Sequence, residues 1–459
     1  MKRPSAWIPK LRKILPAGEL LEDEKGRARH SGDKWFASHM PDVVVDARST
    51  ESVSRTLAFA HKHGIPVTPR GAGHGYVGGC VPVRGGISLS LVRMRKIIEV
   101  HDRDFVAVVQ PGVITAKLQQ RVERKGLYYP PDPASRKDCS IGGNIATNAG
   151  GPKCLKYGVT RDYVLGMEVV LTDGTVVRLG GRNHKNKTGF DLHRLFVGSE
   201  GMLGVVTEAT LKLLPLPTYS ASLSIGFATM KEAAAAIRGI FAAGFLPCAL
   251  EVADEFTLAA ARKRTGSRMF DGCKAHIIVE LDGLIHGVKA DLRELRRLVQ
   301  GLEPVFIKTA NGKEACEKVW ELRREFSYSL RDTGLTKLNE DIVVPRGRLE
   351  DLFLFTSRLQ KDYGLPVACF GHAGDGNIHV NVMVDMEDPE KVAKQDEVLD
   401  KLFGQIVEWG GAITGEHGVG IAKSPWWNLA TTGASRHLHK LVKQALDPAD
   451  ILNPGKFLG

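Results

Sequence analysis

Two histidines and a Glu-His pair are the residues of this chain best suited to chemistry. His372 and His379 flank Ala-Gly-Asp-Gly-Asn-Ile, and Glu416-His417 stands between two glycines. Two imidazoles and a carboxylate form an N,N,O ligand set for zinc or another divalent ion, with positions left open for substrate. Because a metal makes a bound hydroxyl acidic, His417 is the candidate general base. One such histidine alone would more often be a packed or surface residue, but the four residues together favour a metal site.

A β-hairpin is expected to hold the two histidines. Residues 370–381 predict a strand, a Gly/Asp turn and a second strand, so His372 and His379 lie across the hairpin. Side chains two residues apart on a strand share a face, which puts Asn381 beside His379 as a further candidate for the site.

A helix in the same region carries a candidate anchor for an acidic substrate. Trp320-Glu-Leu-Arg323-Arg324 predicts a helical segment, and a guanidinium binds a carboxylate through two parallel hydrogen bonds. Arg323 is therefore the candidate for the substrate carboxylate, while Arg324 is expected at the surface. The alternative for Arg323 is an ion pair with a glutamate of its own helix.

Three blocks of small residues predict a bed for a flat, phosphate-bearing ligand. They cover residues 68–79, 130–151 and 198–208. Their glycines leave the backbone uncovered, so N–H groups can approach the ligand and bind its anionic part. Isolated glycines would only mark tight turns, but three blocks in this order favour a flavin, FAD.

One glycine pattern invites a different interpretation. Gly73-His-Gly-Tyr-Val-Gly78 matches the dinucleotide fingerprint G-x-G-x-x-G. That fingerprint requires a helix whose N-terminus meets the pyrophosphate, whereas residues 80–86 contain Pro82 and two glycines. A Rossmann site is therefore rejected.

The composition is that of an ordinary globular protein large enough for two or three domains. The 459 residues are 43% hydrophobic and 25% charged, which excludes a disordered chain. The net charge is +11, but Lys and Arg are spread along the chain without a nucleic-acid motif. A solvated basic surface is therefore favoured over attraction of an acidic substrate or an anionic membrane, and no nucleic-acid partner is expected.

The cysteines and the N-terminal residues bear on the compartment. Seven cysteines without a C-x-x-C pair argue against a disulfide framework and against an iron–sulfur or zinc cluster, and they indicate a reducing compartment. Residues 1–13 are basic but hold no uninterrupted apolar stretch, and the chain has no run of about eighteen apolar residues. We expect a cytoplasmic protein without a transmembrane segment, peripheral to a membrane at most.

The order of predicted elements indicates an α+β fold, because strands and helices are mixed rather than strictly alternating. Residues 50–63 predict a helix capped by Thr50, and the prolines of Leu214-Pro-Leu-Pro217 end the first domain. Later β-α-β patterns are typical of a ferredoxin-like antiparallel sheet. The predicted limits are 1–217 for the first domain, 218–430 for a cap domain, and 431–459 for a C-terminal helix and tail that return to the first domain.

Six short motifs carry a resemblance to a known family. They are Pro-Arg-Gly-Ala-Gly at 69–73, Ser-Ile-Gly-Gly-Asn at 140–144, Asn-Ala-Gly-Gly at 148–151, Gly-His-Ala-Gly-Asp-Gly-Asn-Ile-His-Val-Asn at 371–381, Gly-Glu-His-Gly at 415–418 and Asn-Pro-Gly-Lys at 453–456. Over nearly its full length the chain resembles the FAD-linked 2-hydroxyacid dehydrogenases of the vanillyl-alcohol oxidase flavoprotein superfamily. This group includes D-lactate dehydrogenase, D-2-hydroxyglutarate dehydrogenase and the glycolate oxidase catalytic subunit. The resemblance implies a two-part, PCMH-type FAD-binding domain followed by a cap domain.

The resemblance also assigns roles to residues of this chain. It implies the same residues as ligands of a divalent metal and the same general base as above, with Arg323 binding the substrate carboxylate. The N,N,O ligand set makes zinc the expected metal. Lys337 is the candidate for a further carboxylate-binding lysine. The residues expected around FAD are Pro69, Arg70, Gly71, Ala72, Gly73, His74, Gly75, Pro133, Ser140, Gly142, Gly143, Asn144, Asn148, Gly150, Gly151, Gly204, Val205, Val206 and Asn453.

One position departs from the family pattern. Many of these dehydrogenases have Thr where this chain has His74, whereas superfamily members with 8α-histidyl-FAD carry His at this step of an Arg-Gly-Gly-His pattern. A covalent flavin link through His74 is one hypothesis. The alternative is a histidine that only hydrogen-bonds a loop or a phosphate.

The combined expectation is oxidation of a 2-hydroxy acid, such as D-lactate or glycolate, to the 2-oxo acid. A hydride would pass to flavin N5 while His417 takes the hydroxyl proton. Electrons would leave to oxygen or an external acceptor: a quinone, a cytochrome, an electron-transfer flavoprotein or a separate iron–sulfur subunit. A homodimer is an open alternative. Two other functions remain open: oxidation of a sugar lactone, alditol or ether lipid precursor without the metal, and a noncatalytic flavin-binding subunit.

Overall fold

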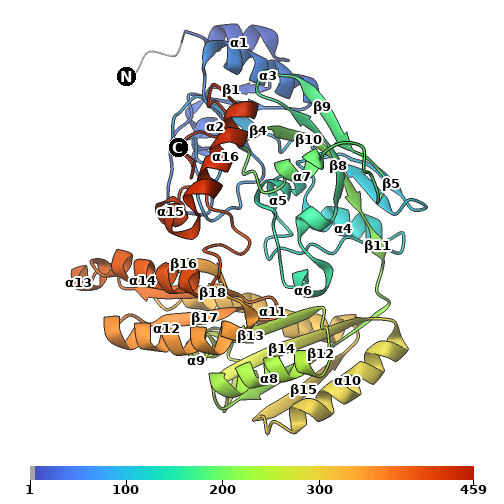
Figure 1. Cartoon of the computed structure of the whole chain (residues 1–459), viewed down its shortest axis with the longest axis vertical. Coiled ribbons are helices and arrows are strands. Elements are labelled where there is room, and N and C mark those ends of the chain that lie inside the picture. The colour runs from blue at the N-terminus through green and yellow to red at the C-terminus, as the bar shows by residue number, and fades with distance from the viewer. Residues whose placement is uncertain (1–5, 459) are drawn as a thin grey trace. The chain divides into compact units, whose positions relative to one another are not determined.

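The computed structural model describes residues 6–458, and these pack as two compact units (Figure 1). The first unit contains the residues up to Gly150, Val159–Leu216 and those from Glu416 onward, and the second contains Gly151–Gly158 and Pro217–Gly415. The domain limits at 217 and 430, drawn from sequence patterns, stay predictions. The first five residues of the basic segment 1–13 lie outside the described residues.

The first unit is built on two sheets and a two-stranded ribbon. One sheet has the order β1-β2-β4-β3, in which β2, β4 and β3 are parallel and β1 is antiparallel to β2. The other has the order β5-β6-β10-β8-β9 and is antiparallel throughout. The strands are β1 (Leu20–Leu21), β2 (Val43–Asp46), β3 (Val67–Arg70), β4 (Ile87–Ser90), β5 (Ile97–His101), β6 (Val106–Val109), β8 (Val164–Val170), β9 (Val176–Gly180) and β10 (Val205–Lys212), with β7 (Leu127–Tyr128) and β11 (Leu214–Pro215) in the ribbon.

Helix α3 (Thr50–His63) confirms a predicted element and corrects its cap. The N-cap is Ser49, whose hydroxyl accepts a hydrogen bond from the N–H of Ser52, so the prediction of Thr50 was wrong. Thr50 instead donates to Glu168 Oε1 at 2.7 Å. Gly64 ends the helix in the left-handed conformation that glycine adopts without strain. The apolar face of α3 packs on the buried valines of β2.

The residues before β2 form two short helices and a short strand. These elements are α1 (Ile8–Ile14), β1 and α2 (Glu24–Ala28). Pro9 stands in the first turn of α1, where a missing N–H costs no intrahelical bond, and Leu11 joins the core of the first unit. The other helices of this unit are α4 (Thr115–Glu123), α5 (Ile141–Thr147), α7 (Leu192–Phe196), α15 (Trp427–Ala430) and α16 (Gly433–Leu446).

The C-terminal tail returns to the first sheet, as predicted. Val67 of β3 donates its N–H to Ile451 O at 2.7 Å, and Asn453 donates its N–H to Val67 O at 2.8 Å. Val67 and Leu452 form a parallel bridge. The last residues of the described chain are therefore placed against β3, beside the loop that follows it.

The second unit is a seven-stranded antiparallel sheet in the order β15-β12-β14-β13-β17-β18-β16. Its first four strands in chain order lie in the spatial sequence fourth, first, third, second, the ferredoxin-like arrangement that the sequence predicts. The strands are β12 (Tyr219–Phe227), β13 (Ala249–Ala253), β14 (Ala275–Gly283), β15 (Phe306–Asn311), β16 (Thr336–Val343), β17 (Val367–His372) and β18 (Asn377–Val384).

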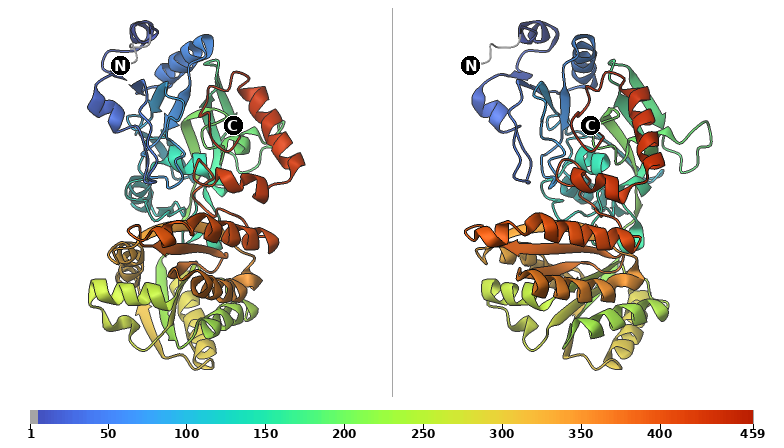
Figure 2. Two further views of the ribbon diagram at one scale, coloured as in Figure 1. Left: turned by 90° about the vertical axis from the view of Figure 1, so that its left-hand side faces the viewer. Right: turned by 60° about the vertical axis from the view of Figure 1, so that its left-hand side comes forward.

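Helices pack on both faces of this sheet (Figure 2). Leu258 of α9 and Phe326 of α11 cover the face that carries Phe370, while Leu359 of α12 packs against Val382 on the other face. Successive strand residues alternate between the faces, so His379 and Asn381 lie on the same face of β18 as Met383, which packs in the cluster with Phe326 and Phe370. The helices are α6 (Cys154–Tyr157), α8 (Met230–Ala242), α9 (Glu255–Thr265), α10 (Ile285–Gln300), α11 (Lys313–Arg331), α12 (Leu349–Tyr363), α13 (Pro389–Val392) and α14 (Gln395–Glu408).

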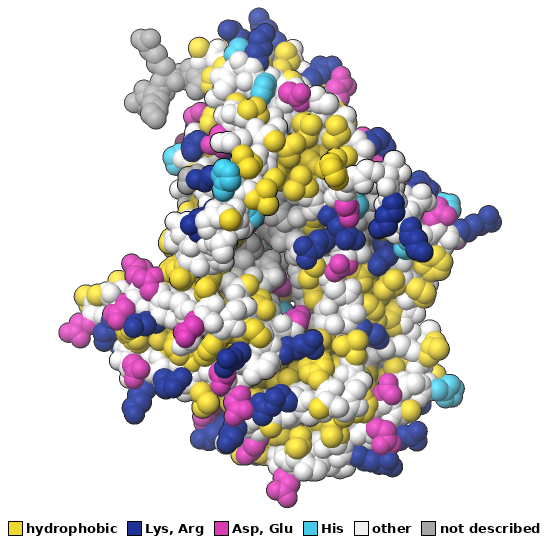
Figure 3. Space-filling view, viewed as in Figure 1, with side chains coloured by type: hydrophobic (Ala, Val, Ile, Leu, Met, Phe, Trp, Pro, Cys, Tyr) yellow, Lys and Arg dark blue, Asp and Glu magenta, His cyan; other side chains and the backbone are white. Residues whose placement is uncertain are grey.

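Two surface properties bear on partners. On the face shown in Figure 3, Lys and Arg side chains are distributed widely, with acidic and hydrophobic side chains among them. Among residues 6–458, no helix combines the length and the apolar character needed to cross a bilayer.

Candidate active site

The loop after β3 lies against the start of α5 in the first unit. Ser140 caps α5, and its Oγ accepts hydrogen bonds from Gly143 N at 3.4 Å and from Ala72 N at 3.3 Å. A Cβ at Gly71 would stand 2.6 Å from Ser140 Oγ, so only glycine allows this approach. Two of the predicted glycine blocks therefore meet at Ser140, whose Oγ accepts a hydrogen bond from each of them.

Arg70 braces this loop with its guanidinium. Nη1 donates to Gly32 O at 2.6 Å and to Cys80 Sγ at 3.1 Å, and Nη2 donates to Arg29 O at 3.3 Å. A Cβ at Gly73 would collide with the same guanidinium. The side chain of this predicted cofactor residue thus shapes the loop through its hydrogen bonds to the protein.

A cavity of about 400 Å³ opens beside the loop. His74 is half-buried at its edge, and burial, together with the charge of Lys34, lowers the pKa of its imidazole. His74 is therefore held toward the neutral form. The lining residues are Ala28, Arg29, Ser31, Gly32, Asp33, Lys34, Trp35, Phe36, Ala37, Ser38, Arg70, Ala72, Gly73 and His74.

Asn453 joins the C-terminal tail to this bed. Its Nδ2 donates to Gly79 O at 2.8 Å and to Glu200 O at 2.7 Å, while its buried Oδ1 accepts no hydrogen bond from any described residue. A buried acceptor without a donor is costly unless a ligand satisfies it. The glycines that permit close packing, the cavity and this acceptor fit a flavin.

The other predicted cofactor residues occupy the same unit with one exception. Asn144 donates to Thr115 Oγ1 at 2.8 Å, and Asn148 ends α5 at φ 53° with its Oδ1 accepting from Arg161 N. Gly151 opens the segment that packs with the second unit. The rest stand on β3 (Pro69), in the loop after it (Gly75), before and in α5 (Pro133, Gly142, Gly143), after α5 (Gly150) and at the start of β10 (Gly204, Val205, Val206).

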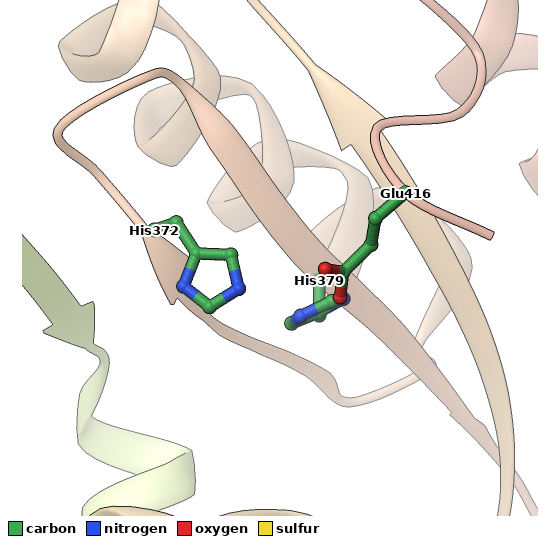
Figure 4. Close-up of side chains that lie close together, drawn as sticks. All are labelled: His372, His379 and Glu416. Carbon is green, nitrogen blue, oxygen red and sulfur yellow. The ribbon is translucent and has the colours of Figure 1, made fainter. Parts of the chain in front are cut away.

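His372, His379 and Glu416, the residues predicted to hold a metal, lie close together. Each offers a ligand atom, and these atoms all lie within 4.8 Å of one another. His372 ends β17 and His379 lies on β18, and only 6% and 8% of their surfaces are exposed. In Figure 4 one ring nitrogen of His372 points toward His379 and the carboxylate of Glu416. Two buried imidazoles and a carboxylate at this spacing fit zinc or another divalent ion.

Asp341 fixes the turn that leads into Glu416. Its Oδ2 accepts from Gly415 N at 2.9 Å and from Thr414 Oγ1 at 3.1 Å, and its Oδ1 accepts from Asn377 Nδ2 at 2.7 Å. Asp341 is fully buried on β16, directly across from His379. One carboxylate thus ties together the hairpin turn and the loop that carries the third ligand.

Arg323 lies in the interior of the second unit. Its Nε and Nη2 both donate to Glu251 Oε2 at 2.7 Å, and the guanidinium lies over the ring of Phe370. The partner carboxylate is on β13, so the alternative of an ion pair within α11 is wrong. Arg324, in contrast, is 39% exposed and pairs with Glu317, which confirms its predicted surface position.

Glu251 contacts His372 as well. Its Oε1 lies 2.6 Å from His372 Nδ1. Burial raises the pKa of Glu251, but the charges of His372 and Arg323 outweigh burial and lower that pKa below its ordinary value.

Lys337 and Asn381 occupy neighbouring strands. Lys337 on β16 donates from Nζ to Ser327 Oγ at 2.7 Å. Ser327 lies on α11, one helical turn after Arg323. Burial, with a smaller effect of Arg331, lowers the pKa of Lys337 to about 8. Asn381 is fully buried, and its Nδ2 donates to His379 O at 3.0 Å.

His417 lies in a loop of the first unit that a buried glutamate holds. Glu200 accepts from Val419 N and from Gly420 N, both at 2.8 Å. The ring of His417 packs against Tyr76 with a centroid distance of 5.3 Å, and its Nε2 lies 3.6 Å from Glu416 Oε1. The proposed base is therefore half-buried and oriented by its loop.

The sequence reasoning missed three positioning carboxylates: Glu200, Glu251 and Asp341. Glu200 and Glu251 are each a single acidic residue with apolar or small neighbours, as in Ala-Leu-Glu251-Val-Ala, whereas Asp341 directly follows Glu340. An acidic residue within an otherwise apolar strand, such as Glu251, indicates a buried charge that needs a partner, and this pattern could have identified it.

Comparison with known proteins identifies the two parts of the chain. Residues 216–457 match the family of FAD linked oxidases, C-terminal domain, and residues 41–180 match an FAD binding domain. The chain is 39% identical over 418 residues to glycolate oxidase subunit GlcD of Bacillus subtilis (strain 168), covering 91% of this chain and 89% of the relative. It is 35% identical to D-lactate dehydrogenase of Anaerostipes hadrus, covering 98% and 96%.

Solved structures agree on the fold. p-Cresol methylhydroxylase matches with a TM-score of 0.79 at 18% identity, covering 98% of this chain and 96% of that chain. Alkyldihydroxyacetonephosphate synthase matches with a TM-score of 0.76 at 22% identity, covering 98% and 85%. The α+β architecture inferred from the sequence is thus shared with both of these solved structures. The chain belongs to the FAD-linked oxidase family and is an FAD-binding oxidoreductase of the glycolate oxidase and D-lactate dehydrogenase type.

Proposed function

We propose that this protein oxidises a small 2-hydroxy acid to the corresponding 2-oxo acid. The observation that carries the proposal is the group of His372, His379 and Glu416, whose ligand atoms lie within 4.8 Å of one another, with His417 next in the chain. Relatives named glycolate oxidase subunit and D-lactate dehydrogenase make glycolate and D-lactate the first acids to test.

The proposed reaction divides its tasks between two cofactors and the side chains that hold them. When bound, FAD would supply a hydride acceptor at N5. A divalent metal would supply a positive charge that acidifies the substrate hydroxyl, and the N,N,O ligand set favours zinc as that metal. His372, His379 and Glu416 would hold the metal. His417 Nε2 would accept the hydroxyl proton, because neutral imidazole is a competent base near neutral pH. The residues of the glycine blocks would hold FAD.

Two cations of the second unit would hold the substrate carboxylate. Arg323 uses Nε and Nη2 on Glu251, so a carboxylate would meet its Nη1 edge. Lys337 lies one helical turn away through Ser327 and would add a second charge. A carboxylate held at one end restricts the orientation of the adjacent carbon, and such positioning lowers the entropic part of the barrier.

The decisive experiment is anaerobic bleaching of the flavin absorbance by D-lactate, L-lactate, glycolate and 2-hydroxyglutarate, with and without a chelator. We expect one acid to bleach the flavin and the chelator to abolish the reaction. Bleaching that persists in chelator would contradict the metal, and no bleaching by any acid with FAD bound would favour a sugar or lipid substrate. In the proposed reaction, flavin that the acid has reduced would pass its electrons to an external acceptor.

We also propose that FAD is attached covalently through His74. The support is its half-buried, neutral imidazole at the edge of the cavity. Acid precipitation of the purified protein should leave flavin on the pellet, and His74→Ala should release it. Complete release from the unmodified protein would contradict the link.

A further inference from the structure

Glu251 is a buried charge in the middle of the seven-stranded sheet. It lies on β13 in Ala-Leu-Glu-Val-Ala, between β14 and β17, and its side chain is 2% exposed. The strand alternation places it with Ala253 on the face that α9 and α11 cover. An ionised carboxylate at such a place is tolerated only with charged or hydrogen-bonding partners.

Both oxygens of Glu251 are used, and each serves a different functional side chain. Oε1 lies 2.6 Å from His372 Nδ1, and Oε2 accepts from Nε and Nη2 of Arg323 at 2.7 Å each. The carboxylate therefore connects a proposed metal ligand with the proposed carboxylate anchor. His372 lies on β17 and Arg323 on α11, two elements that are separated in the sequence by β16 and α12.

We propose that Glu251 is a positioning residue that fixes the tautomer and orientation of His372 and, at the same time, the orientation of Arg323. The proposal rests on the proposed metal site and deepens it. A carboxylate accepts only from a protonated ring nitrogen, so Glu251 holds the proton on Nδ1 and leaves the lone pair of His372 on Nε2. The second ring nitrogen points toward His379 and Glu416 in Figure 4, where a ligand atom is needed.

The chemistry predicts a measurable loss when this carboxylate is changed. Partners of ligating histidines typically contribute roughly 10- to 100-fold to metal affinity, because they select the tautomer and raise the basicity of the ligand. Glu251→Gln keeps the size of the side chain but has one acceptor oxygen. It cannot accept from both His372 and Arg323, and its amide N–H would face a donor.

A matched control exists on the neighbouring strand. Glu280 on β14 is 3% exposed and accepts a hydrogen bond from Trp320 of the same helix α11. Its other contacts are Ser222, Cys248 and Lys153, and none is a proposed ligand. Glu280→Gln therefore removes an equally buried charge from the same sheet without touching His372.

The test is binding of Co²⁺ to the chelator-treated, FAD-containing protein, followed by its visible absorption bands. Glu251→Gln should bind Co²⁺ roughly 10- to 100-fold more weakly than the unmodified protein, with altered bands, whereas Glu280→Gln should match the unmodified protein. Wild-type affinity and bands in Glu251→Gln would overturn the role of Glu251 alone. No Co²⁺ binding by the unmodified protein would overturn the metal site and this role together, independently of any substrate result.

A second measurement needs no variant at Glu251. Nitrogen NMR of the metal-free, histidine-labelled protein, with His372 assigned by its loss in His372→Gln, reports which ring nitrogen carries the proton. We expect the Nδ1-protonated tautomer. An Nε2-protonated ring would overturn the proposal even if Glu251→Gln fails to fold.

Discussion

At the residue scale, buried carboxylates organise the groups proposed to do chemistry. Glu200 accepts two backbone N–H groups beside His417, Asp341 anchors the turn before Glu416, and Glu251 bridges a histidine and an arginine. Each oxygen is paired, which offsets the cost of burying its charge. The chemistry of the site thus depends on residues that would never touch substrate.

The role of His417 can be tested by its removal. His417→Ala should leave FAD bound but slow flavin reduction by the substrate roughly 100- to 10,000-fold, because general base catalysis typically contributes that much. Stopped-flow bleaching under anaerobic conditions measures the rate. His437→Ala, at an exposed position of α16, is the control. Rapid reduction in His417→Ala would refute the assignment.

Lys337 predicts a pH dependence. Its pKa is lowered to about 8 by burial and by Arg331, so the ammonium is charged below that pH and is lost above it. If it holds the substrate carboxylate, KM should rise as the pH increases through about 8. Lys337→Met should have a high KM at every pH and no such rise. A flat KM profile in the unmodified protein would contradict this role.

At the element scale, the hairpin of β17 and β18 was predictable and its surroundings were not. Strand periodicity and the Gly/Asp turn are local signals, and they suffice to place His372, His379 and Asn381 on one hairpin. Glu251 and Asp341 were not predicted because they contact the hairpin from β13 and β16. The order of strands in a sheet cannot be predicted from local periodicity. The partner of Arg323 was missed for the same reason, because Glu251 lies on β13.

The loop that carries His417 provides an element-scale prediction. Glu200→Gln leaves one acceptor for the two N–H groups of Val419 and Gly420 and turns an amide N–H toward one of them. A buried unsatisfied donor costs about 1–3 kcal/mol, so the variant should unfold at lower denaturant concentration and reduce its flavin more slowly. Chemical denaturation and stopped-flow bleaching measure the two effects. Unchanged values in both would show that the loop is held by other contacts.

At the scale of the whole molecule, the C-terminal tail is part of the FAD-binding unit. Lys456 donates to Val81 O at 2.8 Å, and Asn453 donates to Gly79 O and Glu200 O. We expect deletion of residues 449–459 to release FAD, because it removes β3's partner and opens the bed. Flavin absorbance after gel filtration of the truncated protein checks this. Full retention of FAD would mean that the tail is dispensable for the cofactor.

The course of the chain has a consequence for how the protein can be divided. The chain passes between the two units four times, and the short segment Gly151–Gly158 belongs to the second unit although both its neighbours in sequence belong to the first. Within that segment Lys156 and Tyr157 bind the buried Asp282 at 2.6 and 2.8 Å. A recombinant cap fragment cut from one continuous stretch of gene would leave that carboxylate without these partners. Dissection therefore requires a grafted peptide or a circular permutation rather than a single cut.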